Sequence, residues 1–146
     1  MTYCVDVNIL IDAFHPLSPR HAPVRGWLTG ALAQPRSIAI PSQVATGFLR
    51  IVTNRRLFDP PEDPRSAIGF IDWLLEQPSA FIPATGTREV AMMCAMVDKY
   101  GLRAADVSDA ALAACSAVLG ATFVTGDRGF ARFSELTVFD PANSGT

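Results

Sequence analysis

The chain has 146 residues, of which 49% are hydrophobic and 18% charged, and its formal net charge is −2. This length fits a single domain, residues 1–146, with a well-filled core, and the low charged fraction excludes a disordered chain. The near-neutral balance excludes binding of nucleic acid through overall charge, so any such binding needs a local basic patch.

The three cysteines, Cys4, Cys94 and Cys115, lie in apolar segments and lack metal-binding spacing. We therefore expect reduced core cysteines in a cytoplasmic protein. The N-terminus lacks the basic region of a secretory signal. The longest uncharged stretch, 110–126, is interrupted by Gly120, which favours a helix followed by a strand over a membrane span.

In the first half of the chain, short apolar runs alternate with amphipathic segments. Residues 3–7 and 37–40 are predicted strands, and segment 18–35 between them has apolar residues at helical spacing. A further helix is predicted to start at Ser42. The segment "FDPPEDP", residues 58–64, is the strongest loop signal in the chain.

The second half continues the alternation. Asp63 followed by Pro64 predicts a helix N-terminus, residues 80–83 a strand, and Thr87 the cap of a helix that ends before Gly101.

The C-terminal part of the chain also shows signals for helix ends and for strands. Ser108 is predicted to cap the helix 109–119, which Gly120 terminates. A strand at 121–125, a helical turn and a last strand beginning at Thr137 follow. Continuously apolar strands that alternate with helices indicate an α/β domain with a parallel sheet and helices on both faces.

Acidic residues stand at the ends of predicted strands. Asp6 ends the first strand, Asp127 follows the strand 121–125, and Asp109 lies in the first predicted turn of the helix before that strand. Ligands of open α/β sheets bind at the carboxyl ends of the strands, where these acids would meet and repel one another. Oxygen ligands without His or Cys favour Mg²⁺, with Mn²⁺ as the alternative, and such an ion supports phosphodiester hydrolysis.

Each acid also has a purely structural explanation. Asp6 can cap the following helix or turn, Asp109 can interact with a helix dipole, and Asp127 can be a turn residue. The combined placement, rather than any one residue, favours a functional site.

Three stretches carry a family resemblance: "YCVDVNILIDAF", "FLRIVTNRRLF" and "VSDAALAACSAVLGATFVTGDRGFARFSELTVFDP". In this order they resemble the PIN-domain ribonucleases, specifically the VapC-type toxins of toxin–antitoxin pairs. The resemblance implies a three-layer α/β/α PIN-like domain with a central, mostly parallel sheet of about five strands. It also implies a metal-dependent endoribonuclease, a VapB-like antitoxin partner, homodimers, and contact with DNA only through the antitoxin.

The resemblance assigns roles to individual residues. Asp6, Asp109 and Asp127 match the family's catalytic, metal-binding acids, and Asn8 and Thr125 match small polar positions that line such sites. For the RNA backbone we expect contacts from basic side chains, namely Arg50, Arg55, Arg56, Arg128 and Arg132. A structural ion pair is the alternative for Arg50, and simple exposure is the alternative for Arg55 and Arg56.

Two departures from the family pattern matter. The helix after the second strand often carries a Glu, but Gly47 or a neighbour takes that place, and Gly129 replaces a further acid. One tightly held ion is therefore the expectation, and a catalytically weak or inactive PIN-fold module that binds RNA or protein is the alternative function.

Two further classes of protein fit the sequence less well. A phosphatase with an aspartyl nucleophile usually has a second Asp where Asn8 stands, and a receiver-like domain needs a Lys after a late strand, whereas Lys99 lies in a helix. Two helices also carry more apolar side chains than a small sheet must cover, which suggests a groove for an antitoxin helix or a second subunit. These side chains are Trp27, Leu28, Leu32, Ile71, Trp73, Leu74 and Leu75.

Overall fold

The computed structural model describes residues 1–143, so the predicted domain end at residue 146 lies outside the described residues. Five strands form one sheet in the order β3-β2-β1-β4-β5, and all the pairings between them are parallel. The strands are β1 (Tyr3–Val5), β2 (Ile38–Ala39), β3 (Ala80–Phe81), β4 (Thr122–Val124) and β5 (Thr137–Phe139). Their carboxyl ends therefore share one edge of the sheet.

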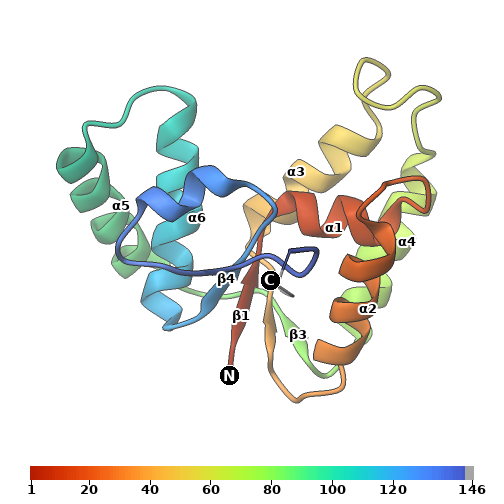
Figure 1. Ribbon diagram of the computed structural model, residues 1–146, viewed down its shortest axis with the longest axis horizontal. Coiled ribbons are helices and arrows are strands. Elements are labelled where there is room, and N and C mark those ends of the chain that lie inside the picture. Colours follow the sequence, from red (N-terminus) through yellow and green to blue (C-terminus); the bar gives the residue numbers. More distant parts are fainter. Residues whose placement is uncertain (144–146) are drawn as a thin grey trace.

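Helices cover both faces of this sheet. They are α1 (Val7–Phe14), α2 (His21–Ala31), α3 (Ser42–Val52), α4 (Pro64–Glu76), α5 (Gly86–Tyr100) and α6 (Ala105–Leu119), with a short 3₁₀ helix, η1 (Arg128–Arg132). Figure 1 shows α5 and α6 on one side of the sheet and α1 to α4 on the other. The predicted three-layer α/β/α fold with a parallel five-stranded sheet is confirmed.

Aromatic side chains fill the core on each side of the sheet. Phe48 of α3 lies edge-on to Phe14 of α1 and tilted against Phe70 of α4, with ring centroids 5.3 and 5.4 Å apart. On the other side Phe130 packs between Phe123 and Phe133. Edge-to-face and tilted pairs at these distances contribute roughly 0.5–1.5 kcal/mol each beyond their burial.

Several predicted helix boundaries are confirmed by their capping geometry. The Asp63 carboxylate accepts a hydrogen bond from the backbone N–H of Arg65, and Pro64 is the first residue of α4. Gly101 and Gly120 end α5 and α6 with φ of 64° and 63°, the left-handed conformation that glycine adopts without steric cost.

The end of the first strand and the start of α6 differ from the prediction. The first strand ends at Val5 rather than Val7, because Asp6 leaves the strand and caps α1. Helix α6 begins at Ala105, four residues before the predicted 109, after a turn in which Ala104 has φ of 52°. Ser108 is therefore not a cap, and Asp109 lies in the second turn of the helix, not the first.

The prediction for α5 was also partly wrong. The helix begins at Gly86, after Thr85, so Thr87 is not its cap. Cys94 is exposed rather than buried, because α5 turns a neighbouring face toward the core, on which Met96 is fully buried. Cys4 and Cys115 are buried as expected.

Most of the apolar side chains on α2 and α4 belong to the core. Leu28 and Leu74 are fully buried, and Trp27 packs against Tyr3 of the sheet. Within residues 1–143, no helix is both long and apolar enough to cross a membrane.

Candidate active site

Asp6 lies at the carboxyl edge of the sheet, between β1 and α1. Its backbone N–H donates to the carbonyl of Val124 on β4 at 3.0 Å, which continues the pairing of the two central strands. The residue is only 4% exposed, and its Oδ1 accepts a hydrogen bond from the N–H of Val7 at 2.7 Å. The sequence folds this way because an Asp at an N-cap satisfies a backbone donor that the helix leaves free.

Two polar side chains hold the other oxygen of this carboxylate. Asp6 Oδ2 accepts from Thr125 Oγ1 at 2.7 Å and from Asn8 Nδ2 at 3.1 Å. Asn8 in turn accepts from the N–H of Gly126 at 2.9 Å, so α1 and the residues after β4 are tied together. A carboxylate offers about four acceptor positions, of which these contacts and the Val7 contact fill three, leaving one on Oδ1.

Asp127 and Asp109 reach this edge from two other elements. Asp127 is exposed just after β4, and its Oδ1 caps η1 by accepting from the N–H of Gly129 at 2.8 Å. Its own N–H donates to Thr125 Oγ1 at 3.0 Å, which fixes it beside the Asp6 network. Asp109 projects from α6, and its side chain is 33% exposed.

The other two acids act electrostatically on Asp6. Burial raises the pKa of Asp6 above its ordinary value of 3.8, and hydrogen bonds from Thr125 and Val7 oppose this rise. The charges of Asp127 and Asp109 both raise the pKa of Asp6 further. The structure therefore brings the three predicted acids into one electrostatic neighbourhood.

The donor set fits a hard divalent cation, although it is not a closed cage. Within the part of the chain that the structure describes, no three His, Cys, Asp or Glu side chains form a compact metal-binding group. The available donors are carboxylate oxygens that repel one another and raise the pKa of Asp6. A cation bound to the remaining acceptor position on Asp6 and to either neighbouring acid would relieve that repulsion.

Arg132 is a predicted RNA-binding residue that contacts one of the three acids, Asp109, and also the neighbouring Asp106. Its Nη2 lies 3.3 Å from Asp109 Oδ2 and 3.4 Å from Asp106 Oδ1. The guanidinium also lies over the ring of Phe133, 4.4 Å from its centroid.

The other predicted RNA-binding arginines are spread more widely. Arg128 lines a hollow of about 400 Å³ that also contains Thr125 and Asp127. Arg50 lines an open groove of about 490 Å³ on α3, and it forms no ion pair with any residue of 1–143. Arg55 and Arg56 are exposed in the turn after α3.

Gly47 lies on the face of α3 that meets the start of α1. A Cβ added there would be 3.5 Å from Val7 Cγ2, which is an ordinary van der Waals contact. The position that lacks the family's acid therefore has room for a side chain.

A second network behind the site was not predicted. Arg20 Nε donates to Asp12 Oδ2 at 3.1 Å, and Arg20 Nη2 donates to Asp140 Oδ1 at 2.5 Å. The Asp12 side chain is only 14% exposed. No spacing in the sequence reveals this network, because its members lie far apart along the chain.

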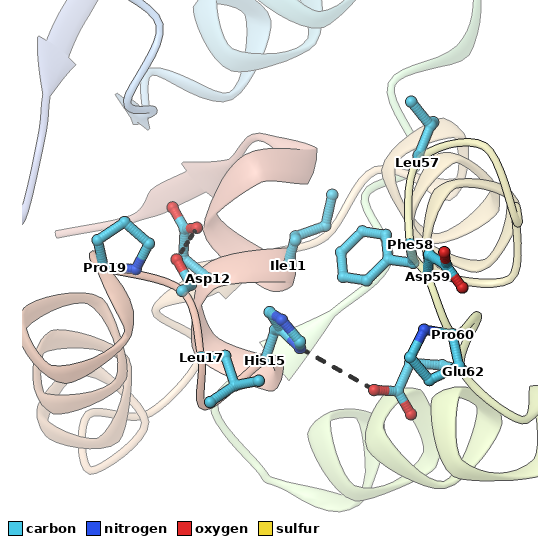
Figure 2. Close-up of a pocket in the computed structure, with 11 residues that line it drawn as sticks. Ile11, Asp12, His15, Leu17, Pro19, Leu57, Phe58, Asp59, Pro60 and Glu62 are labelled. Atoms are coloured by element: carbon cyan, nitrogen blue, oxygen red, sulfur yellow. Dashed lines mark hydrogen bonds and ion pairs between the residues drawn. The ribbon is translucent and has the colours of Figure 1, made fainter.

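A cavity with a volume of about 600 Å³ lies elsewhere, between the loop after α1 and the loop after α3 (Figure 2). Apolar side chains that include Ile11, Leu57 and Phe58 line it together with acids. His15 faces Glu62 across it, with Nδ1 and Oε1 4.0 Å apart. It contains none of the three predicted catalytic acids, so we do not assign it to the chemistry.

Comparison with known proteins gives consistent matches over almost the whole chain. The PIN domain family model matches residues 3–136. Ribonuclease VapC43 of Mycobacterium tuberculosis is 36% identical over 143 residues, which cover 98% of this chain and 97% of that protein. Ribonuclease VapC25 of the same organism is 30% identical over 139 residues, covering 95% of this chain and 98% of that protein.

Solved structures show the same fold at lower identity. VapBC2 from Rickettsia felis, bound to a DNA fragment from its promoter, contains a chain with a TM-score of 0.71 and 18% identity. That match covers 96% of this chain and 98% of the other.

Proposed function

The chain belongs to the PIN-domain family and, within it, to the VapC ribonucleases, and from that membership we propose a metal-dependent endoribonuclease. In this proposal it is the toxin of a VapBC-type pair, it cleaves cellular RNA, and a cognate VapB-like antitoxin neutralises it. The observation that carries the site assignment is the buried Asp6 carboxylate, whose pKa is raised by burial and by the nearby charges of Asp127 and Asp109.

The three acids would hold Mg²⁺ or Mn²⁺, with Asp6 as the most firmly oriented ligand. When bound, such a cation activates water as a nucleophile and offsets charge on the scissile phosphate. Thr125 and Asn8 keep the Asp6 carboxylate in one orientation through their hydrogen bonds. Asp127 is held beside it by the bond from its N–H to Thr125.

Basic side chains around this edge would position the RNA. Arg128 and Arg132 flank Asp127 and Asp109, and Arg50 lines the groove on α3. Contacts of these guanidinium groups with phosphates position the strand without reading its sequence. Arg55 and Arg56 are more distant candidates for the same role.

An RNA cleavage assay with Mg²⁺ or Mn²⁺ tests this function. Asp6→Asn and Asp109→Asn each remove one charge from the proposed site. Loss of a residue that only supports a metal ligand typically lowers activity about 10- to 100-fold, so each of these variants should lower the cleavage rate by at least that factor. Asp72→Asn is the matched control, because Asp72 is exposed on α4. EDTA should abolish cleavage by the wild type.

The result that contradicts the site is cleavage by Asp6→Asn and Asp109→Asn at the wild-type rate. Weak cation binding in calorimetry together with no cleavage by the wild type would instead support the inactive binding module. The absence of an acid at Gly47 is the observation that favours this second candidate.

Assembly and location remain proposals. We expect a homodimer in the cytoplasm that contacts DNA only through its antitoxin. Light scattering of the purified chain measures the oligomeric state.

A further inference from the structure

Arg132 is held over the acidic edge by three kinds of contact. It comes from η1, the 3₁₀ helix that Asp127 caps, and its Nη1 donates to the carbonyl of Gly129 at 2.7 Å. Its guanidinium lies over Phe133, which is buried and therefore forms a fixed platform. From this platform its Nη2 reaches Asp109 and Asp106 on successive turns of α6.

The bonds to the two acids are weak enough to exchange. Their lengths of 3.3 and 3.4 Å exceed the usual 2.7–2.9 Å of charge-assisted bonds. The Asp106 side chain is 60% exposed and that of Arg132 is 35% exposed, so water screens both pairs. Arg20 offers a contrast, because its bond to Asp140 is 2.5 Å long and both side chains are less exposed.

We propose, building on the function above, that Arg132 is an internal counter-ion that competes with the divalent cation for Asp109. Before a cation binds, Arg132 partly neutralises Asp109 and limits the repulsion around Asp6. When a cation binds Asp109, Arg132 keeps its ion pair with Asp106, its contact with the Phe133 ring and its hydrogen bond to the Gly129 carbonyl. Asp106 thus serves as the partner that keeps Arg132 beside the site without being a cation ligand.

Calorimetric titration of the full-length chain with Mn²⁺ tests this competition directly. Arg132→Gln removes the competitor, so Mn²⁺ affinity should rise by about two- to fivefold, the range expected for loss of exposed ion pairs. Arg132→Lys keeps the charge and should return the affinity toward that of the wild type. The gain should shrink at about 0.5 M salt, because screening weakens the pairs that compete.

Arg128→Gln is the matched control for loss of positive charge. Arg128 is exposed in the same 3₁₀ helix, and within residues 1–143 it forms no ion pair. Its replacement should change Mn²⁺ affinity by less than about twofold, since only long-range charge is lost. Thermal melting of each variant shows whether η1 has remained folded.

Nuclear magnetic resonance gives a second readout that does not depend on a substitution. Titration of the wild type with Mg²⁺ should shift the Nε–Hε signal of Arg132 as Asp109 leaves it, and the signal of Arg20 should stay unchanged. The proposal is overturned if Arg132→Gln binds Mn²⁺ no better than Arg128→Gln, or if the Arg132 signal does not respond to Mg²⁺.

Failure of this inference can be distinguished from failure of the proposed function. If only the counter-ion role is wrong, the wild type still binds Mn²⁺ and cleaves RNA, and Arg132→Gln resembles Arg128→Gln. If the wild type neither binds Mn²⁺ nor cleaves RNA, the counter-ion role and the metal-dependent function are both overturned.

Discussion

The Asp6 carboxylate has the structural role of a helix cap, and in our proposal it also has the chemical role that the sequence presented as the alternative. It caps α1 through Oδ1, and it receives Thr125 and Asn8 on Oδ2. These hydrogen bonds favour its charged form, but burial outweighs them, so its pKa lies above the ordinary value. An ionised Asp6 without a cation therefore lowers the stability of the folded chain.

This gives a pH dependence with a definite sign. Because the folded state binds the Asp6 proton more tightly than the unfolded state, the stability that this residue contributes is present below its ordinary pKa of 3.8 and is lost as pH rises through the raised value. The test compares the melting temperatures of the wild type and Asp6→Asn in EDTA. The wild-type value minus the Asp6→Asn value should fall as the pH increases from about 3.8 upward. Mg²⁺ at neutral pH should raise the melting temperature of the wild type more than that of Asp6→Asn.

Asp72→Asn again serves as the control for replacing a carboxylate with an amide, because Asp72 is exposed on α4. Other groups titrate in this range with the opposite sign. Burial raises the pKa of Asp140, but its bonds with Arg20 and Ala142 lower the pKa more, so Asp140 stabilises the chain above 3.8. If the melting temperature of the wild type minus that of Asp6→Asn instead rises with pH, the Asp6 carboxylate is stabilised as an anion.

At the scale of single residues, the sequence predicted the acids better than it predicted their surroundings. An acid after an apolar strand is visible in the sequence, as at Asp6 and Asp127. The link from Arg132 to Asp109 is not visible, because it depends on how η1 packs against α6. The role of Arg132 as an RNA contact remains a prediction.

At the scale of elements, the residues after β4 are braced by Arg20 at the start of α2. The guanidinium joins Asp12 of α1 to Asp140 after β5 and lies against Gly126. A Cβ on Gly126 would approach Arg20 Nη2 to 2.6 Å, and the ion pairs prevent the guanidinium from moving away easily. Glycine is therefore favoured at position 126 because the Arg20 side chain lies so close to it, and not because of its backbone conformation.

A double-mutant cycle measures this coupling. Arg20→Gln should lower the free energy of unfolding by about 1–3 kcal/mol, because two half-buried carboxylates lose their partner. Gly126→Ala should also lower the free energy of unfolding of the wild type, but it should lower that of Arg20→Gln by less. The difference between the two effects, which is the coupling energy, should be about 0.5–2 kcal/mol. Urea denaturation of the four proteins gives these values.

Gly69→Ala is the control for replacing a glycine. Gly69 lies inside α4 with no neighbour within 4 Å of an added Cβ, so alanine there should stabilise the chain by about 0.5–1 kcal/mol. Additive effects of Arg20→Gln and Gly126→Ala would contradict the bracing role of Arg20.

The alternation of strands and helices was predictable from the sequence except for α1, whose first residue was assigned to the first strand. Several element ends were not predictable. The caps at Asp63, Gly101 and Gly120 act locally, so their residue types predict them. Helix α6 has no side-chain cap, and it starts after Ala104, whose φ is 52°. Ser108 gave a false cap signal because serine is also tolerated inside a helix.

At the scale of the whole molecule, the surface offers an acidic, partly apolar cavity to a partner. The cavity in Figure 2 carries Asp12, Asp59 and Glu62, and no Lys or Arg is among its described lining residues. Leu17 and Leu57 at this cavity are 84% and 61% exposed. This combination suits a segment of the cognate antitoxin that presents an apolar side chain together with a basic one.

Leu57→Asp tests this docking site. Burial of an exposed leucine in an interface is lost in this variant, so binding of the antitoxin encoded beside this chain's gene should weaken by about tenfold or more. RNA cleavage in the absence of antitoxin should be retained, since Leu57 lies in the α3–α4 loop and does not belong to the proposed catalytic acids. Val90→Asp is the matched control, because Val90 is 53% exposed on α5, on the opposite face of the sheet. Equal losses of antitoxin affinity in the two variants, measured by calorimetry, would show that the cavity is not the site of recognition.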